Sequence, residues 1–582
     1  MNKKLIFLIV SFLYMVTATA QPLLIPYPRS IEMREGYFAL TAKTGIINLS
    51  DKNNARLLKH YIEEDININL HEQRGDNNIF LITNRKLKES LGAEGYRMNI
   101  SADSIVIEGA ENAGVFYGIQ TLRQLAAQNR LAIPCMEIFD KPEYEWRDFM
   151  LDEARHFKGK VVVKQLLEEM AYLKMNKFHW HLTDDQGWRI EIEKYPRLTQ
   201  IGAYRDSTQI GGWNSPLYDV NIHGGYYTRE DIREIVDFAA ERHIEIVPEI
   251  EMPGHSEEVL ATYPELSCSG KPYVNADFCI GTEKTFEFLE NVLLEVIDLF
   301  PSEYIHIGGD EASKSSWKTC PRCQKRMADE HLNSVDELQS YMIHRIEKFL
   351  NDHGRKIIGW DEIIEGGLSP TATVMSWRGE EGGIKAVKAG NQAIMTPGKY
   401  CYLDAFQDAP NTQPMAIGGY LTLEKVYSFE PVPDSLSTKE AELILGVQGN
   451  VWTEHIPTPE HYEYMIYPRI LALAEIGWSP SEVKKWDNFH TRALQAVNML
   501  REQGYNPFPL EKEIGDKPES YQKVNHLAIG KKVTYANLYS NHYAAQGEKT
   551  LVDGVRGGWM YNDDRWQGFI DCDFDAVSYT HL

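Results

Sequence analysis

The residues best suited to chemistry in this chain are two adjacent carboxylates, Asp310 and Glu311, in the sequence YIHIGGDE. The apolar, β-branched run 304–307 is typical of a buried strand, and Gly308 and Gly309 allow a sharp bend directly after it. Adjacent side chains on a regular strand point to opposite faces, so the pair cannot flank a bond symmetrically, as two independent catalytic carboxylates do. We therefore expect the two carboxylates to have unlike tasks. The structural alternative is an acidic turn or a helix cap.

Polar and aromatic side chains also follow the other predicted strands. LDEARH contains Arg155, FHWHLTDDQGW contains Asp184, and PEIEMPGHS contains His255. Because the carboxyl ends of parallel strands meet at one rim of a barrel, we expect these side chains to lie near the two carboxylates. For Arg155, a salt bridge to Asp152 or Glu153 is the alternative to binding a ligand. The remaining candidates at strand ends are Trp360, Trp377, Tyr402, Asp404, Trp452 and Glu454.

His179 and His181 lie on one face of a predicted strand. Some metal-dependent hydrolases hold zinc with such an HxH pair, so a zinc hydrolase is a rival hypothesis. Interior histidines satisfied by hydrogen bonds are the commoner arrangement, and we expect neither a metal nor a cofactor in the site. Treatment with a chelator separates the two hypotheses, because a metal-free site predicts no loss of activity.

The elements that must position these residues are short apolar strands alternating with helical patterns, which is typical of βα units around a parallel sheet. Helices are predicted between the strands, for example at 161–173, 229–242, 285–299 and 335–353. Eight strands are the number that a (β/α)8 TIM barrel requires. They are expected at 146–152, 177–182, 244–250, 304–307, 356–360, 373–377, 392–395 and 443–447.

The chain is long enough for several domains. Residues 21–141 are predicted to form a small α+β domain, with strands at 46–49, 79–83, 96–100 and 104–108 and a helix at 112–128. The barrel is assigned to 142–510, closing near Gly477 with a terminal helix at 486–503, and the start of a β-sandwich module to 523–582. The final letters, VSYTHL, are typical of sequencing-adapter read-through, so we expect the natural protein to be longer.

Charge and the N-terminal segment restrict the partners and the location. A net charge of −24 disfavours binding to nucleic acid or an anionic membrane and favours a neutral substrate. Residues 1–20 combine two lysines, an apolar run and the sequence ATA, which predicts a signal peptide and an exported protein in the periplasm, on the cell surface or in the medium. No later stretch has the roughly 18 apolar residues of a membrane-spanning helix.

Seven cysteines are few for an exported chain of 582 residues, so we expect no disulfide framework. Cys320 and Cys323 form a CPRC loop, which favours a local disulfide, then a redox motif, and lastly zinc, because no second pair of ligands is evident. Cys268 and Cys279 are predicted to bridge a loop. The other three, Cys135, Cys401 and Cys572, are expected to be free.

Taken together, these motifs resemble the β-N-acetylhexosaminidases of glycoside hydrolase family 20, from about residue 23 to residue 503. That resemblance implies substrate-assisted catalysis, in which the 2-acetamido oxygen of the sugar attacks the anomeric carbon and no enzyme nucleophile is needed. It implies that Glu311 is the general acid and base and that Asp310 orients the acetamide. Asp184 and His255 then tune the proton affinity of the acid.

The same resemblance assigns the remaining candidates to substrate binding. Tyr402 matches the tyrosine that holds the acetamide carbonyl, and the three tryptophans, which suit the apolar faces of a pyranose ring, match the walls around it. Arg155, Asp404 and Glu454 match residues that bind ring hydroxyls. The implied activity is exo-acting, retaining removal of terminal β-linked N-acetylglucosamine or N-acetylgalactosamine from glycans.

The segment 527–575, with AIGKKVT, LVDG and WQGF, resembles the front of a discoidin-like, galactose-binding module. Such modules attach sugar-degrading enzymes to glycans. A third hypothesis follows, in which the barrel is inert and the chain is a carbohydrate-binding scaffold. A chromogenic glycosidase assay distinguishes it from the enzyme.

Overall fold

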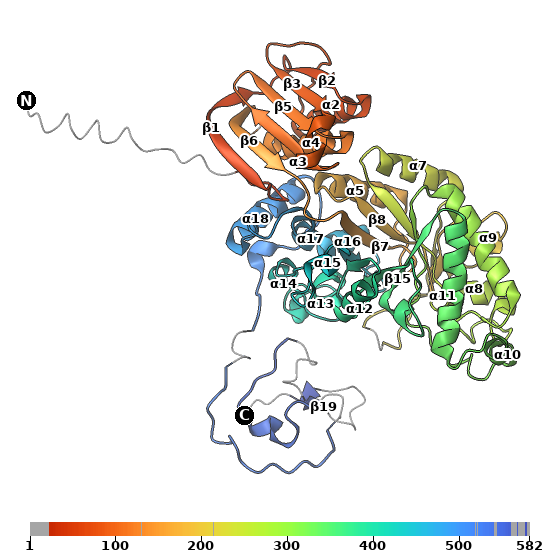
Figure 1. The fold of residues 1–582 in the computed structure, drawn as a ribbon. Coiled ribbons are helices and arrows are strands. Elements are labelled where there is room, and N and C mark those ends of the chain that lie inside the picture. The colour runs from red at the N-terminus through yellow and green to blue at the C-terminus, as the bar shows by residue number, and fades with distance from the viewer. Residues whose placement is uncertain are drawn as a thin grey trace, which may run out of the picture. The chain divides into compact units, whose positions relative to one another are not determined.

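The computed structural model describes residues 22–129, 131–212, 215–517, 520, 522–539, 544–559, 567–568 and 577–578 (Figure 1). The predicted signal peptide lies outside these residues. The chain divides into two compact units. One comprises the chain up to Glu143 with Trp478–Lys484, and the other comprises Tyr144–Gly477 with Lys485–Leu582. The limits predicted for the domains stay predictions.

The N-terminal unit is a six-stranded mixed sheet with helices α2 (Lys52–Ile66) and α4 (Asn112–Asn129), of which α4 packs on the sheet. The sheet order is β1-β6-β4-β5-β3-β2. Alternate residues of β4 are buried, as expected for a strand with one covered face. Helix α2 and strands β1 and β6 were not predicted from the sequence. The strands are β1 Ser30–Ala39, β2 Gly45–Leu49, β3 Asn78–Thr83, β4 Tyr96–Ile100, β5 Ser104–Gly109 and β6 Ala132–Asp140.

The second unit is built on a closed barrel of eight parallel strands, which confirms the predicted (β/α)8 class. Around the barrel the order is β13-β14-β15-β16-β17-β18-β7-β8. The strands are β7 Trp146–Asp152, β8 Lys177–His181, β13 Glu245–Glu249, β14 Tyr304–His306, β15 Lys356–Trp360, β16 Thr373–Ser376, β17 Ala393–Met395 and β18 Ile444–Val451. Every residue of β7 and β18 is buried, because one face of each strand points into the barrel and the other lies under helices.

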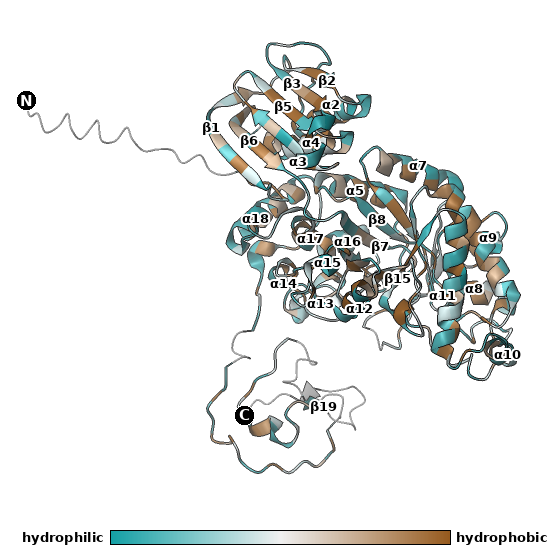
Figure 2. Ribbon diagram, in the orientation of Figure 1, coloured by the Kyte–Doolittle hydropathy of each residue, from teal (hydrophilic) through white to brown (hydrophobic). Residues whose placement is uncertain are grey.

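Helices cover the outside of the barrel, and both hydropathy colours occur along them (Figure 2). α7 (Arg229–Ala240) is capped by a capping box between Thr228 and Asp231. α11 (Val335–Asp352) is preceded by its N-cap Ser334, whose side chain accepts a hydrogen bond from the Glu337 backbone N–H. The longer helices are α5 Lys160–Tyr172, α7 Arg229–Ala240, α9 Glu283–Leu299, α10 Pro321–Asp329, α11 Val335–Asp352, α12 Glu381–Ala389, α16 Pro459–Ile466, α17 Arg469–Trp478 and α18 Trp486–Glu502.

Short elements lie in the loops at the strand ends. They are β9 Thr183–Asp184, β10 Gly187–Trp188, β11 Tyr204–Arg205, β12 His223–Gly224, α6 Arg197–Gln200, α8 Glu257–Thr262, α13 Gly398–Cys401, α14 Leu423–Tyr427 and α15 Thr438–Ala441. β9 contains the predicted site residue Asp184, and Tyr402 directly follows α13, so these loops help to set the geometry of the rim.

The described part of the C-terminal segment contains one 3-10 helix, Gly547–Val552, and one pair of two-residue strands, β19 Gln567–Gly568 and β20 Val577–Ser578. These elements do not define a β-sandwich, and the discoidin-like module stays a prediction. None of the helices described is both long and apolar enough to span a membrane.

Candidate active site

One pocket of about 350 Å³ brings together all eleven residues that the sequence analysis singled out. Its volume is at the small end of the usual range for ligand sites, roughly 300–1,000 Å³, which suits a single sugar ring. The lining residues come from the carboxyl ends of the barrel strands and the loops that follow them. They are Arg155, Asp184, His255, Asp310, Glu311, Trp360, Trp377, Tyr402, Asp404, Ile417, Trp452 and Glu454.

The two carboxylates lie just beyond β14, in a loop whose backbone requires glycine. Gly308 has φ +65°, and a Cβ added there would lie 1.8 Å from the Glu251 Oε2 atom. The next glycine, Gly309, has φ +99°. Glu311 itself adopts the left-handed region, with φ +44°. This bend gives the two carboxylates different surroundings, because the Asp310 side chain is 10% exposed and that of Glu311 is 59% exposed.

His255 connects the two carboxylates to Asp184. Its Nδ1 atom lies 3.0 Å from Asp184 Oδ1, and its Nε2 atom lies 3.5 Å from both Asp310 Oδ2 and Glu311 Oε2. Asp184 also accepts a hydrogen bond from His181 Nε2 at 2.9 Å and pairs with the Arg155 guanidinium at 2.7 Å. The structure therefore places a continuous chain of charged groups behind the acidic pair.

These contacts set the charges in the pocket. Burial raises the pKa of Asp310 to about 6, although His255 opposes this. The hydrogen bond from His255 lowers the pKa of Glu311. Burial alone would lower the pKa of His255, but Asp184 and Asp310 hold it well above its usual range. Burial would likewise raise the pKa of Asp184, yet Arg155 and His255 hold it well below its usual range.

Aromatic rings form a wall of the pocket. The Trp360 and Trp452 rings lie 5.8 Å apart, and Trp377 stacks on Tyr402 with centroids 6.1 Å apart and an interplanar angle of 20°. Two of the indoles are held by carboxylates: Trp360 Nε1 donates to Glu249 at 2.8 Å, and Trp377 Nε1 donates to a glutamate in the loop after β15 at 2.9 Å. The rings are therefore fixed with apolar faces available to a ligand.

Arg155 and two further carboxylates form the polar side of the pocket. Arg155 pairs with Asp152 at 3.3 Å, as one alternative predicted, and also with Asp184 and with Glu454 at 3.4 Å. Burial raises the pKa of Asp404 to about 8. Among the residues that line the pocket, three buried carboxylate oxygens have no hydrogen-bond partner in the described part of the chain: Asp310 Oδ1, Asp404 Oδ1 and Glu454 Oε2. Buried oxygens of this kind are acceptors suited to the hydroxyl and N–H groups of a ligand.

His179 and His181 do not line the pocket but lie inside the barrel below it. Both ring nitrogens of His181 contact carboxylates, Nδ1 with Glu249 and Nε2 with Asp184. Burial would lower the pKa of His181, but Glu249 and Asp184 raise it to about 10. A protonated imidazole has no lone pair for a metal, so these contacts favour a structural role over zinc binding. The absence of a metal in the catalytic pocket stays a prediction.

Three residues that matter to the site were missed by the sequence analysis. Glu251 lies buried against Gly308, and burial together with Asp310 holds its pKa well above its usual range. Glu362 holds Trp377, and Ile417 completes the lining. The first two were accessible from the sequence, because Glu251 directly follows a predicted strand in PEIE and Glu362 lies two residues after one in GWDE. Ile417 lies in a long loop and carries no such signal.

Comparison with known proteins identifies the family. The glycosyl hydrolase family 20 catalytic-domain model matches residues 144–481, and the domain 2 model of the same family matches 21–141. A β-hexosaminidase of Porphyromonas gingivalis is 41% identical, with 84% of this chain and 65% of that protein covered, and one of Vibrio furnissii is 36% identical, with 78% and 76% covered.

A solved relative has the same fold. The exo β-N-acetylglucosaminidase of Vibrio harveyi, solved in complex with N-acetylglucosamine, superposes with a TM-score of 0.76 at 31% identity, covering 84% of this chain and 79% of that one. The chain thus spans just under two thirds of the Porphyromonas relative and more of the other two. Its catalytic-domain match covers more than half of its length. The chain belongs to glycosyl hydrolase family 20.

Proposed function

We propose that this protein is an exo-acting, retaining β-N-acetylhexosaminidase that removes terminal, non-reducing N-acetylglucosamine or N-acetylgalactosamine from glycans. The observation that carries the proposal is the single pocket that unites Asp310 and Glu311 with an aromatic wall and with buried, unpartnered carboxylate oxygens. A pocket of about 350 Å³ has room for one sugar, which supports exo action. The family and the relatives described above support the same substrate class.

In the proposed reaction the acetamide oxygen of the substrate attacks its own anomeric carbon and forms an oxazolinium-like intermediate. Asp310 accepts a hydrogen bond from the acetamide N–H and stabilises the positive charge that develops on the ring. Its buried carboxylate, with Oδ1 unpartnered, suits this task. Tyr402 donates to the acetamide carbonyl, and the tryptophans Trp360, Trp377 and Trp452 enclose the group.

Glu311 protonates the oxygen of the leaving sugar and then takes a proton from the water that opens the intermediate. Two inversions at one carbon give net retention. His255, 3.5 Å from Glu311 and hydrogen-bonded to Asp184, adjusts the proton affinity of this acid. The more exposed position of Glu311 suits contact with a leaving group that extends out of the pocket.

The polar side of the pocket selects the end of a glycan. Arg155 is held by three carboxylates and presents a guanidinium of fixed orientation to ring hydroxyls. Asp404 and Glu454 supply unpartnered acceptors. We propose that these three residues bind the terminal sugar. We further propose a neutral glycan as partner, no cofactor, and an exported location; the charge and the N-terminal sequence motivate the first and last of these.

Paired aryl glycosides test the proposal. The chain should release 4-nitrophenol from the 2-acetamido gluco- or galacto-configured β-glycosides, and barely from the corresponding glycosides that carry a hydroxyl in place of the acetamide. Equal rates on both sets would refute the mechanism, and no turnover of either would favour the binding-scaffold hypothesis. The ratio of the gluco and galacto rates also gives the preferred hexosamine.

A further inference from the structure

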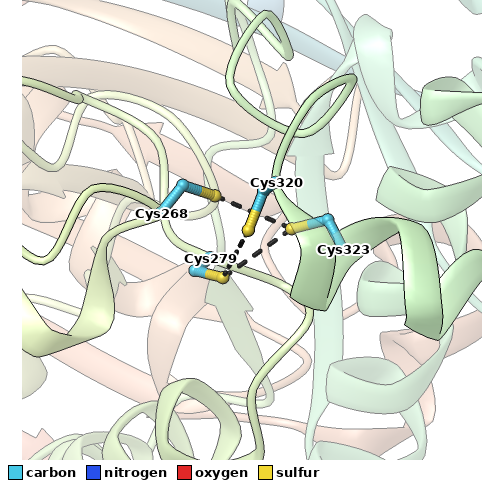
Figure 3. Close-up of side chains that lie close together, drawn as sticks. All are labelled: Cys268, Cys279, Cys320 and Cys323. Carbon is cyan, nitrogen blue, oxygen red and sulfur yellow. Dashed lines mark hydrogen bonds between the residues drawn. The ribbon is translucent and has the colours of Figure 1, made fainter.

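Four cysteines from two loops converge outside the catalytic pocket, and all four are unbridged thiols in the structure (Figure 3). The Sγ atoms of Cys268 and Cys323 lie 3.7 Å apart, those of Cys279 and Cys320 lie 3.8 Å apart, and those of Cys279 and Cys323 lie 3.7 Å apart. All four sulfurs lie within 4.8 Å of one another. The predicted local pairs, Cys320 with Cys323 and Cys268 with Cys279, are therefore not the arrangement found, and the second ligand pair judged absent from the sequence exists.

The spacing of the sulfurs matches a tetrahedral metal site. With a Zn–S distance of about 2.3 Å, the corners of a regular ZnS4 tetrahedron lie about 3.8 Å apart. The three Sγ–Sγ separations given above, 3.7 to 3.8 Å, agree with that value. We propose that Cys268, Cys279, Cys320 and Cys323 bind one Zn²⁺ ion. Binding releases the four thiol protons and leaves a ZnS4 centre of net charge −2.

The surroundings suit such a centre. Cys279 and Cys323 are fully buried and Cys320 nearly so, which keeps water from the sulfurs. Cys320 is the N-cap of α10, so the N-terminus of a nine-residue helix faces the thiolates. The Gly281 backbone N–H donates to Cys279, and the Arg322 guanidinium, which donates to the Ser267 carbonyl at 2.7 Å, lies beside the sulfurs and offsets their charge.

The two cysteine pairs belong to the two loops that carry the acid chemistry. Cys268 and Cys279 follow His255 in the segment after β13. Cys320 follows Glu311 in the loop after β14, and Cys323 lies in the first turn of α10, which ends that loop. The loops also meet directly, because Asp277 accepts hydrogen bonds from the Ser313 and Lys314 backbone N–H groups at 3.2 and 3.0 Å. The metal thus holds the His255 loop against the Asp310–Glu311 loop. In the pocket, His255 Nε2 lies 3.5 Å from a carboxylate oxygen of each of these two residues.

The backbones of the two cysteine-bearing segments pack closely beside the sulfurs, at Gly281 and Arg322–Cys323. A Cβ added to Gly281 would lie 2.2 Å from the Arg322 carbonyl carbon and 2.3 Å from the Cys323 backbone nitrogen. Trp317 Nε1 donates to the Phe278 carbonyl at 2.9 Å, which ties the same segments together beside the sulfurs. A glycine at this point is therefore required for the two pairs of cysteines to meet.

Elemental analysis of the full chain, purified without chelator or added zinc, tests the site. The wild type and the control Cys135→Ala, a buried cysteine of β6, should each hold about one zinc per chain. Cys279→Ser and Cys268→Ser should hold almost none; the second replaces the most exposed ligand and is the variant better suited to fold. Replacement of zinc by Co²⁺ should give the visible absorption of tetrahedral cobalt thiolate in the wild type and in neither serine variant.

Removing the metal from the wild type tests whether the zinc ion holds the two loops together. A chelator should lower Tm by at least about 5 °C, and stoichiometric Zn²⁺, but not Mg²⁺, should restore it. The kcat/KM of the remaining folded protein should fall at least about fivefold, since small displacements of catalytic groups are costly. With this zinc site outside the pocket, loss of activity in a chelator no longer identifies a zinc hydrolase by itself; Cys279→Ser, which keeps His179 and His181, should show the same partial fall. This activity readout rests on the proposed function; the metal content does not. An unchanged kcat/KM in zinc-free protein would refute the claim that the zinc ion positions the two loops for catalysis.

Three results would overturn the zinc site itself. A metal-free wild type, with the four thiols protected from alkylation as two disulfides, would assign the cluster to cystines. One iron per chain would overturn the choice of zinc. Zinc retained at wild-type level in both serine variants would place the ion elsewhere, for example among the barrel histidines.

Discussion

Replacing Asp310 with asparagine removes the charge that the proposed mechanism needs while keeping the size of the side chain. Asp310 is only 7% exposed, so little water screens it. A carboxylate about 4 Å from a unit positive charge stabilises that charge by about 4 kcal/mol at an effective dielectric constant of 20. Asparagine retains an acceptor for the acetamide N–H, worth about 1 kcal/mol. Because both side chains accept that hydrogen bond, the loss is the charge contribution alone, about 4 kcal/mol, which corresponds to roughly a thousandfold in kcat/KM.

The assay is kcat/KM on the 4-nitrophenyl 2-acetamido glycoside, whose good leaving group keeps proton donation from limiting the rate. The matched control is Asp148→Asn, a buried carboxylate of β7 that bonds Trp146 Nε1 at 2.8 Å and does not line the pocket. Circular dichroism gives the folded fraction of each variant. If folded Asp310→Asn retains kcat/KM within about threefold of the wild type, the charge-stabilising role of Asp310 is wrong.

Further predictions concern the acid, the pH profile and the loop backbone. Glu311→Gln should lose about 10²- to 10⁴-fold in kcat/KM on a methyl glycoside but far less on a dinitrophenyl glycoside; equal losses would contradict general-acid catalysis. In the proposed mechanism, Glu311 must be protonated to act as the acid, and Asp310 must be ionised to stabilise positive charge. Burial raises the pKa of Asp310 to about 6 and the hydrogen bond from His255 lowers that of Glu311, so in the free protein the one proton of the pair resides mainly on Asp310 and must pass to Glu311 for catalysis. This proton is lost as pH rises through about 6. The kcat/KM profile should therefore fall above about pH 6 and fall again at more acid pH, where both carboxyl groups are protonated, and a plateau extending to pH 8 would contradict these charges. Gly308→Ala should lower the free energy of unfolding by about 2–4 kcal/mol, from clash and positive φ, whereas Gly390→Ala, with open space around it, should cost about 1–2 kcal/mol; urea titration compares them.

The barrel was predictable because its strands are buried on both faces and appear in the sequence as continuous apolar runs, such as β15. The N-terminal sheet was harder. Exposed and partly exposed residues dominate β1, so its sequence, SIEMREGYFA, lacks an apolar run, and only pairing with β6 makes it a strand.

The site was predictable to the extent that its residues directly follow strands. The order of the pKa values of Asp310 and Glu311 was not predictable. It depends on burial and on the distances of His255 from both carboxylates, which the sequence does not give. The cysteine cluster was also missed. Cys279 and Cys320 are separated by 41 residues, and only the passage of α9 and β14 between them brings their loops together.

The central claim is that the nucleophile belongs to the substrate. Its most direct test is kcat/KM for a series of 4-nitrophenyl 2-acylamido glycosides in which the acetamide methyl carries zero, one, two or three fluorine atoms. Each fluorine withdraws electrons and weakens the carbonyl oxygen as a nucleophile. Attack by the acetamide predicts that kcat/KM falls with every fluorine added. A rate independent of fluorine, accompanied by a sugar covalently bound to a side chain during turnover, would contradict it.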